Sequence, residues 1–361
     1  MRVQTFEIPT DQPESDGTLE WDSTTVVVVE VERDGATGLG YTYADASVAQ
    51  LIESKLAPLV REHDPVAPGE TWARMRVALR NVGQQGAGAM ALSAVDIALW
   101  DLKARLLGVC LADALPRFHD SVPVYGSGGF TSYSLERLRE QCGGWVEQGI
   151  PRVKIKVGRD PAADPERLDA VRDAIGPEPE LYVDANGAFT AKEALAWAQR
   201  YRSEWDVSYF EEPVSSEDLD GMRFVREHGP AGLAIAAGEY AWDLADLGRM
   251  APCVDVLQAD VTRCGGITAF IRADAIARVH GVPLSAHCAP AISAHACCAW
   301  ESLAHLEYFH DHTRIEPMLF DGVLDPDGGA LTPDRTRPGH GLELRPDASE
   351  QVARHSDPPG P

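Results

Sequence analysis

The chain has 361 residues, which is enough for two domains, one of them large. Lys and Arg number 32 and Asp and Glu 56, so the net charge is −24. This acidity argues against nucleic acid or an anionic membrane surface as a partner, because both attract an excess of basic side chains. A hydrophobic content of 44% with 24% charged residues indicates a folded globular protein. Neither a signal sequence nor an apolar run of transmembrane length is recognisable, so a cytoplasmic location is expected.

The first part of the chain predicts an antiparallel sheet followed by helices. Thr24–Gly35 is a β-branched run that ends in the hairpin dipeptide Asp-Gly, and the segment GLGYTYAD follows as its partner strand. Between Thr10 and Asp22, Pro, Gly and Asp predict a mobile loop that carries one bulky aromatic residue, Trp21. Ala91–Gly108 has helical periodicity and ends at a glycine suited to a helix C-terminus.

From Ser121 onward, strand and helix patterns alternate. The strand candidates are VPVYGSGG, RVKIKVG, ELYVDANG, VSYFEEP, LAIAAGE, VDVLQAD, VPLSAH and HLEYFH. Eight short strands joined mostly by amphipathic crossovers predict a (β/α) barrel, with a doubly wound open sheet as the alternative. Polar residues at the C-terminal ends of the strands favour the barrel, because barrel active sites form there. The polar, Pro-rich tail PDASEQVARHSDPPGP is predicted to fray. The seven cysteines are scattered, odd in number and without CxxC spacing, which predicts buried reduced thiols.

Three successive barrel strands each end in a carboxylate: Asp184, Glu211 and Glu239. Neighbouring strand ends would bring these groups to one point, where they repel one another unless a cation lies between them. A hard cation with oxygen ligands, best Mg²⁺, resolves this repulsion. Alternatively, each acid caps the helix that follows it, but three in succession favour the metal site.

The strand before them carries Lys154 and Lys156, two of only five lysines in the chain. Residues i and i+2 of a strand share a face, so both ammonium groups are expected inside the barrel. Two like charges buried together should lower the pKa of at least one lysine, which would make it a usable base near neutral pH. A pair of solvated surface lysines is the alternative, and it fits an inward-facing barrel strand poorly.

On the opposite wall, Asp260 and His287 end the sixth and seventh strand candidates. Adjacent strand ends would let the carboxylate accept a hydrogen bond from the imidazole, orient it and raise its basicity. His295, in the following helix, is the competing histidine. Glu316 lies just past the eighth strand candidate, from where it could reach the barrel mouth.

Taken together, these residues resemble the enolase superfamily and, within it, the mandelate racemase subgroup. The motifs that carry the resemblance span nearly the whole chain: SAVDIALWDLKA, KIK, DANGAF, FEEP, GEY, QADVTRCGGIT, SAH and IEP. The resemblance implies an α/β fold, a modified TIM barrel (β/α)7β with an N-terminal α+β capping domain. The expected divisions are a cap over residues 1–120 with a specificity loop at about 10–22, a barrel over 121–315, and a C-terminal return to the cap over 316–361. A homo-oligomer is also implied.

Residue by residue, the resemblance implies one Mg²⁺ per subunit held by Asp184, Glu211 and Glu239, with Glu212 as a secondary candidate. Lys156 resembles the base on one face of the substrate, and His287 with Asp260 resembles the dyad on the other face. The resemblance assigns the remaining positions as substrate contacts: Lys154 to the substrate carboxylate, Glu316 to the enolate oxygen, Asn186 as a polar neighbour, and Trp21 on the specificity loop. In QADVTRCGGIT, an aspartate stands where the muconate-lactonizing and dipeptide-epimerase branches have lysine, so the racemase-type dyad is complete. The Gly265-Gly266 pair is read as tightening the start of a helix rather than as a phosphate cradle.

This set of groups predicts abstraction of the proton α to a carboxylate, with the developing charge stabilised by Mg²⁺. The leading hypothesis is an acid-sugar dehydratase, a carbon–oxygen lyase that converts an aldonate or aldarate to a 2-keto-3-deoxy acid. The alternatives are a racemase or epimerase that uses the same two bases, and a barrel that binds a ligand without chemistry. The expected partner is a small carboxylate substrate.

Overall fold

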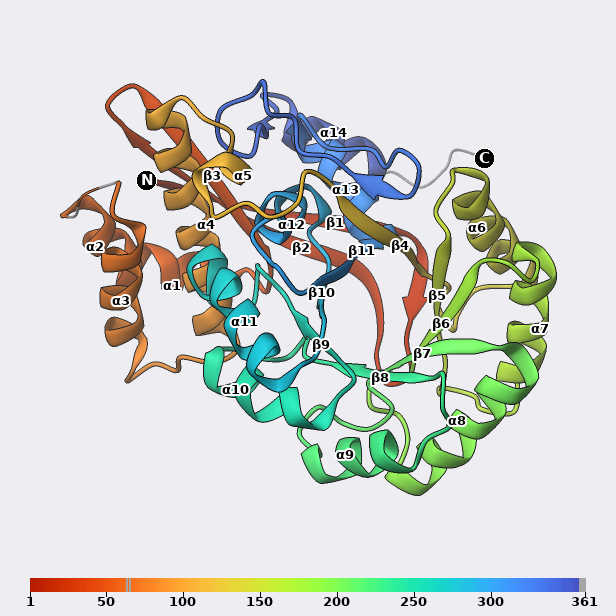
Figure 1. Ribbon diagram of the computed structural model, residues 1–361. Coiled ribbons are helices and arrows are strands. Elements are labelled where there is room, and N and C mark those ends of the chain that lie inside the picture. The colour runs from red at the N-terminus through yellow and green to blue at the C-terminus, as the bar shows by residue number, and fades with distance from the viewer. Residues whose placement is uncertain (63, 65, 357–361) are drawn as a thin grey trace.

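Three antiparallel strands and six helical segments form the N-terminal part of the computed structural model, which describes residues 1–62, 64 and 66–356 (Figure 1). The strands pair in the order β1 (Arg2–Ser15), β2 (Glu20–Arg33) and β3 (Ala36–Tyr43). Asp34 and Gly35 both adopt positive φ, as the two-residue turn between β2 and β3 requires. The helical segments are α1 (Ser47–Leu51), the π-helical η1 (Ile52–Leu56), α2 (Ala57–Arg61), α3 (Pro68–Leu79), α4 (Ala87–Leu107) and α5 (Leu111–Ala114).

The β1–β2 hairpin differs from the predicted mobile loop. β1 runs to Ser15 and β2 begins at Glu20, so most of the segment between Thr10 and Asp22 is strand, although within it only Glu14 with Trp21 and Ser15 with Glu20 pair, beyond a register shift after Pro9. Two contacts fasten its tip to the barrel: Ser15 Oγ lies 2.6 Å from Thr131 Oγ1, and the Trp21 ring packs edge-on against Phe130. Local composition predicted a loop because these long-range contacts, which stabilise the strands, leave no mark in the sequence of the segment itself.

Eight parallel strands form the second part of the fold, and all eight were predicted. They pair successively from β4 to β11, and an additional β11–β4 pairing closes the sheet into a barrel (Figure 1). The predicted barrel is therefore confirmed, and the open-sheet alternative is excluded. The strands are β4 (Val122–Gly128), β5 (Arg152–Lys156), β6 (Glu180–Asp184), β7 (Val207–Glu211), β8 (Ala234–Ala237), β9 (Val256–Ala259), β10 (Leu284–Ala286) and β11 (Leu303–Phe309).

Helices surround this barrel and connect its strands (Figure 1). None of the helices in the described part of the chain is both long and apolar enough to cross a membrane. All seven cysteines are buried free thiols, as predicted. The helices are α6 (Leu135–Glu147), α7 (Asp164–Ile175), α8 (Ala191–Trp205), α9 (Leu219–His228), α10 (Leu244–Met250) with the short 3₁₀ turn η2 (Ala251–Cys253), α11 (Gly266–His280) and α12 (Pro290–Cys297).

The strand register brings the chemical groups to one level of the barrel. Lys156 pairs with Asp184, Asp184 pairs with Glu211, and Glu211 pairs with Ala236, so the ends of four neighbouring strands lie in one layer. Below this layer, Tyr125, Tyr182 and Tyr209 pack around His305 and fill the barrel interior. The polar groups are therefore confined to the C-terminal mouth, as in other barrels of this type.

The residues after β11 contact both the barrel and the cap. α13 (His310–Leu319) leads into the short strands β12 (Phe320–Asp321) and β14 (Glu343–Leu344), which pair with each other, while β13 (Ala330–Leu331) pairs with β4. The backbone of His340 donates to Asp101 on α4.

Part of the tail that was predicted to fray is helical: α14 (Ala348–Ser356) buries Ala348 and Val352, which lie one turn apart. This apolar pair at positions i and i+4 allows α14 to pack against β1 and α13. The prediction missed the pair because the tail as a whole is polar and Pro-rich. Residues 357–361 lie outside the described part of the chain.

The cap docks on the barrel through α4 and the start of α11. Ser93 Oγ accepts hydrogen bonds from the backbone N–H groups of Gly265 and Gly266, each at 3.0 Å. Both glycines have positive φ, and a Cβ on Gly266 would lie 2.6 Å from the Asp96 side chain. These N–H groups thus bind the cap, which agrees with the structural interpretation of the glycine pair over a phosphate cradle.

Candidate active site

The carboxylates of Asp184, Glu211 and Glu239 converge at the barrel mouth. One oxygen of each lies within 4.8 Å of the others, and all three side chains are buried. Asp184 and Glu211 end β6 and β7, while Glu239 follows β8 by two residues. Among the buried polar atoms, Oε1 of Glu211 and Oε1 of Glu212 have no hydrogen-bond partner. Octahedral Mg²⁺ places its oxygen ligands about 3 to 4 Å apart, so three carboxylate oxygens within 4.8 Å of one another fit the ion in chemistry and can contact it after at most a small contraction.

Glu212, the secondary candidate, is buried beside these three ligand candidates. Its backbone has φ 37°, and burial together with the charges of Glu239 and Asp184 raises the pKa of its carboxyl. A carboxyl of this kind carries its negative charge only when a cation compensates it.

Both lysines of β5 point into the same cluster. Lys154 Nζ lies 2.6 Å from Glu211 Oε2, and Lys156 Nζ lies 2.5 Å from Asp184 Oδ2. Burial alone would lower both lysine pKa values, but the adjacent carboxylates have the larger combined effect and raise both. With these carboxylates free of a metal ion, the pKa shift of both lysines is upward, opposite to the predicted lowering. The difference arises because the prediction counted the repulsion between the two ammonium groups without the carboxylates that contact each of them, whereas Mg²⁺ on Asp184, Glu211 and Glu239 would offset the charge of those carboxylates.

The opposite wall is formed by His287, which follows β10. Its Nδ1 lies 2.7 Å from Asp260 Oδ2, and its Nε2 lies 2.9 Å from Glu239 Oε2. Burial lowers the pKa of His287. The facing groups Cys288, Glu239 and Glu307 raise this pKa by a larger amount, so the net shift is upward. Asp260 thus lies where the sequence placed it, beside the imidazole of His287.

The competing histidine, His295, is buried on α12 and lies 3.5 Å from Cys110 Sγ. It is not among the residues that line the cavity at the barrel mouth. This placement favours His287 over His295 as the histidine of the site.

The structure separates Glu316 from the mouth and reveals Glu307 in its place. Glu316 lies on α13, where its carboxylate accepts a 2.5 Å hydrogen bond from Tyr41 and another from the backbone of Ala291. Glu307, on β11, lies 2.8 Å from Lys154 Nζ and 3.4 Å from His287 Nε2. The signal for Glu307 was present in HLEYFH, because strand alternation directs His305, Glu307 and Phe309 to one face.

A cavity of about 440 Å³ opens above these groups, between the cap and the barrel mouth. Its walls include Lys156, Glu239 and His287, together with two residues singled out from the sequence, Asn186 and Trp21. The cap contributes hydroxyl, aromatic and acidic side chains to this wall. The cap residues are Asp16, Leu19, Trp21, Ser23, Thr24, Thr25, Tyr43, Ala44 and Asp45.

Comparison with known proteins agrees with this geometry. Residues 5–115 match the family described as mandelate racemase / muconate lactonizing enzyme, N-terminal domain. Residues 137–348, more than half of the chain, match the enolase C-terminal domain-like family. The chain belongs to the enolase superfamily. Within it, its relatives place it with the mandelate racemase subgroup, as the sequence motifs predicted.

Two characterised relatives of this enolase-superfamily chain have different activities. The 3,6-anhydro-alpha-L-galactonate cycloisomerase of Streptomyces coelicolor is 33% identical over 88% of this chain and 89% of its own length. The L-talarate/galactarate dehydratase of Salmonella typhimurium is 30% identical over 91% of this chain and 82% of its own length. Both relatives are enolase-superfamily enzymes whose names are those of a dehydratase and a cycloisomerase of sugar acids, and the coarse statement that they support for this chain is an enzyme of that superfamily.

Solved structures confirm the fold and identify the metal. A mandelate racemase/muconate lactonizing enzyme-like protein from Rubrobacter xylanophilus is 63% identical, with a TM-score of 0.96 over 97% of this chain and 98% of that one. A racemase from Streptomyces coelicolor, solved with bound magnesium, is 29% identical, with a TM-score of 0.89 over 98% of both chains. The Salmonella dehydratase, solved with Mg and L-lyxarohydroxamate, is 28% identical, with a TM-score of 0.87 over 97% of this chain and 91% of that one. The cofactor of this superfamily member is Mg²⁺.

One buried carboxyl of the hairpin gives a prediction for stability. Burial and the nearby charges of Asp311 and Asp11 raise the pKa of Glu14 to about 9, while Trp21 and Arg314 partly oppose this shift. The folded protein therefore keeps a proton that the unfolded chain loses at about pH 4.5, so folding stability falls as pH rises between these two pKa values. Glu14→Gln removes this dependence and keeps an acceptor for the indole N–H of Trp21.

We expect Glu14→Gln to be more stable than the wild type at alkaline pH. The difference in unfolding free energy should grow between about pH 6 and about pH 8.5, by at most about 1.4 kcal/mol per pH unit. Urea denaturation at several pH values measures it, with Glu53→Gln, at an exposed position, as the matched control. A constant difference across this range would contradict the buried, protonated state of Glu14.

Proposed function

We propose that this enzyme removes the proton α to the carboxylate of an acid sugar and eliminates the β-hydroxyl, giving a 2-keto-3-deoxy acid. The observation that supports this proposal is the two-sided arrangement of Lys156 and His287, which line one cavity beside the carboxylate cluster. Two proton-transfer groups on different walls suit a reaction in which one takes a proton and the other delivers one.

In this proposal, Asp184, Glu211 and Glu239 hold Mg²⁺, which supplies positive charge to the substrate carboxylate. Either Lys156 or His287 takes the α-proton, and the electron pair of the C–H bond moves toward the carboxylate as an enediolate. That electron pair then expels the β-hydroxyl, which leaves as water after taking a proton from the second group. The enol that remains tautomerises to the 2-keto acid.

The resemblance gave Glu316 as the acid that contacts the enolate oxygen; in this proposal the acid at the barrel mouth, which positions Lys154, is instead Glu307. Its Oε1 accepts hydrogen bonds from Ser127 Oγ at 2.6 Å and from Lys154 Nζ at 2.8 Å. Burial alone would raise the pKa of the Glu307 carboxyl. The charges of Lys154 and His287 lower this pKa by a larger amount, which keeps Glu307 ionised. An ionised Glu307 fixes the ammonium of Lys154, the group proposed to contact the substrate carboxylate.

The cap wall narrows the substrate class. The cap-derived residues that line the described cavity include the acidic Asp16 and Asp45 and no Lys or Arg. The end of a sugar acid remote from the carboxylate cluster would face this wall, where hydroxyl groups find hydrogen-bond partners and a second carboxylate meets like charge. We therefore favour an aldonate, with one carboxylate, over an aldarate with two.

Cycloisomerisation is the second candidate, because the Streptomyces coelicolor relative at 33% identity carries that activity. The same α-proton abstraction would then be followed by breakage of a ring C–O bond at the β-carbon, so the leaving oxygen would remain in the product. A racemase or epimerase would instead return a proton to the α-carbon.

Proton NMR in D₂O with Mg²⁺ and pooled aldonates and aldarates distinguishes these reactions. We expect loss of the α-proton together with a new methylene signal from one aldonate, with the diacids turned over more slowly. The pool should also contain lactone and anhydro-sugar acids, since turnover of only these would favour the cycloisomerase. Exchange of the α-proton without a new methylene would indicate a racemase or epimerase. No reaction with any compound in the pool would reject acid sugars as the substrate class.

A further inference from the structure

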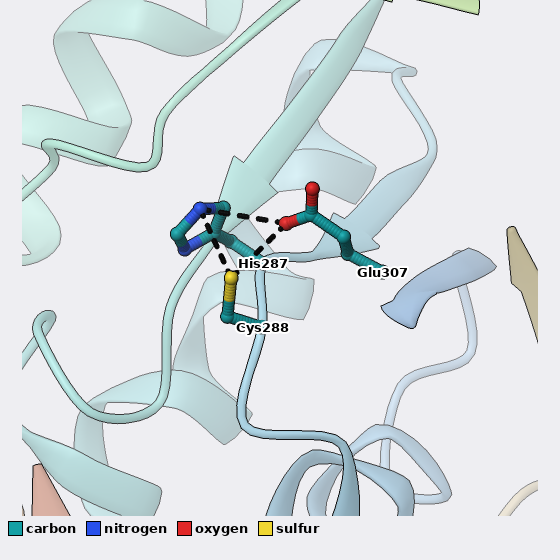
Figure 2. A group of neighbouring side chains, drawn as sticks. All are labelled: His287, Cys288 and Glu307. Carbon is teal, nitrogen blue, oxygen red and sulfur yellow. Dashed lines mark hydrogen bonds and ion pairs between the residues drawn. The ribbon is translucent and has the colours of Figure 1, made fainter. Parts of the chain in front are cut away.

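Three side chains of different chemistry point toward one another at the ends of β10 and β11 (Figure 2). Cys288 Sγ lies 3.3 Å from His287 Nε2 and 3.2 Å from Glu307 Oε2, while Nε2 and Oε2 are 3.4 Å apart. Both His287 and Cys288 line the cavity, with 6% and 2% of their surface exposed. The activity proposed above uses His287 and Glu307 but gives no role to Cys288.

The spacing of these three donor atoms matches one face of a tetrahedral zinc site. Bonds of about 2.3 Å to sulfur and about 2.0 Å to nitrogen and oxygen place tetrahedral donors about 3.3 to 3.6 Å apart. The observed separations of 3.2 to 3.4 Å need only a small expansion. A thiolate selects Zn²⁺ and related transition metals over Mg²⁺, which prefers oxygen ligands alone.

The surrounding hydrogen bonds orient two of the three donors, His287 and Glu307, for a metal. Asp260 Oδ2 lies 2.7 Å from His287 Nδ1, so the proton on Nδ1 is held there and Nε2 is the coordinating atom. Ser127 and Lys154 bind Oε1 of Glu307, which leaves Oε2 to the cluster. Cys288 has φ 53°, a left-handed backbone conformation.

We propose that His287 Nε2, Cys288 Sγ and Glu307 Oε2 form a second metal site, selective for Zn²⁺-class ions, whose occupation blocks catalysis. Binding forms one metal–nitrogen, one metal–sulfur and one metal–oxygen bond without any redox change. The thiol proton of Cys288, and any proton on Nε2, pass to solvent. A water molecule would complete the coordination, because Glu239, whose Oε2 lies 2.9 Å from the same nitrogen, is assigned to Mg²⁺. With Nε2 occupied, His287 can neither accept nor deliver a proton.

Cobalt provides a test that needs no knowledge of the substrate. Co²⁺ added to the Mg²⁺-saturated protein should produce a near-ultraviolet thiolate-to-cobalt charge-transfer band and the intense visible bands of tetrahedral cobalt. Cys288→Ala should abolish the charge-transfer band. Cys298→Ala, which removes a buried thiol that is not part of the cluster, should retain it. Absence of the band from the wild type, or its persistence in Cys288→Ala, would overturn the site.

Inhibition by Zn²⁺ provides the second test, in any assay that reports turnover or α-proton exchange. At saturating Mg²⁺, Zn²⁺ should inhibit the wild type and Cys298→Ala alike, and should inhibit Cys288→Ala about tenfold or more weakly. Further Mg²⁺ should not restore activity. Full recovery with Mg²⁺, together with equal Zn²⁺ potency in both variants, would show displacement of Mg²⁺ instead and reject the second site. If Cys288→Ala does not fold, Cys288→Ser takes its place. The cobalt band remains decisive even if the proposed reaction is wrong.

Discussion

Replacing Lys156 by methionine, or His287 by asparagine, should lower kcat by about 10³-fold in each case, because each change removes one of two proton-transfer groups. Lys156 Nζ contacts Asp184 and His287 Nε2 contacts Glu239, so the two groups flank the carboxylate cluster from different strands. Neither replacement can carry a proton, yet both occupy similar volume. Steady-state kinetics on the identified substrate measures the loss.

Isotope exchange separates the roles of these two residues. The variant that lacks the α-proton base should lose both elimination and α-proton exchange in D₂O. The variant that lacks only the group protonating the leaving hydroxyl should still exchange the α-proton. Lys192→Met and His280→Asn, at exposed positions away from the cavity, are matched controls and should retain wild-type rates. If both site variants kept more than about a tenth of kcat, the two-base assignment would fail.

The sequence predicted the barrel and its carboxylate cluster because both depend on short periodic patterns. Each strand is a short apolar run, and one acid per strand–helix unit must converge when neighbouring strands lie in parallel. The register confirms this convergence, since Asp184 pairs with both Lys156 and Glu211. The same rule predicts an inward Glu307 on β11, but the later IEP motif directed attention to Glu316 instead.

The features that sequence could not predict depend on distances between remote segments. The segment predicted as a loop forms strand because Ser15 and Trp21 contact the barrel. The Pro and Gly content of the segment does not reveal these contacts. The pKa of Lys156 rises because Asp184 lies 2.5 Å from its ammonium, and a pattern of residue types carries no such distance.

Glu307→Gln and Glu316→Gln should show which of two carboxylates acts at the site: Glu316, which the sequence motifs favoured, or Glu307, which the structure places beside Lys154. Glu307→Gln removes the charge that fixes Lys154 at 2.8 Å, and displacement of a substrate-binding group should lower kcat by about 10²-fold. Glu316→Gln keeps an oxygen for the Tyr41 hydroxyl and lies outside the cavity wall, so kcat should change little.

The free energy of unfolding distinguishes these two variants independently of kcat, because, relative to the wild type, Glu316→Gln should gain stability as the pH rises whereas Glu307→Gln should lose stability. Burial raises the pKa of Glu316 from 4.5 to about 8, so folding stability falls as the pH rises between these two values and stays lower above them, whereas a neutral glutamine avoids this cost. Glutamine keeps an acceptor for only one of the Tyr41 and Ala291 hydrogen bonds, so the informative quantity is the pH dependence: relative to the wild type, Glu316→Gln should gain stability as the pH rises from about 4.5 to about 8. Glu307→Gln should be less stable, because it leaves the buried ammonium of Lys154 with one fewer carboxylate partner. A loss of kcat in Glu316→Gln with no loss in Glu307→Gln would return the role to Glu316. A loss of kcat in Glu307→Gln with little loss in Glu316→Gln would show that the acid that acts with Lys154 is the one on strand β11 and not the one on helix α13.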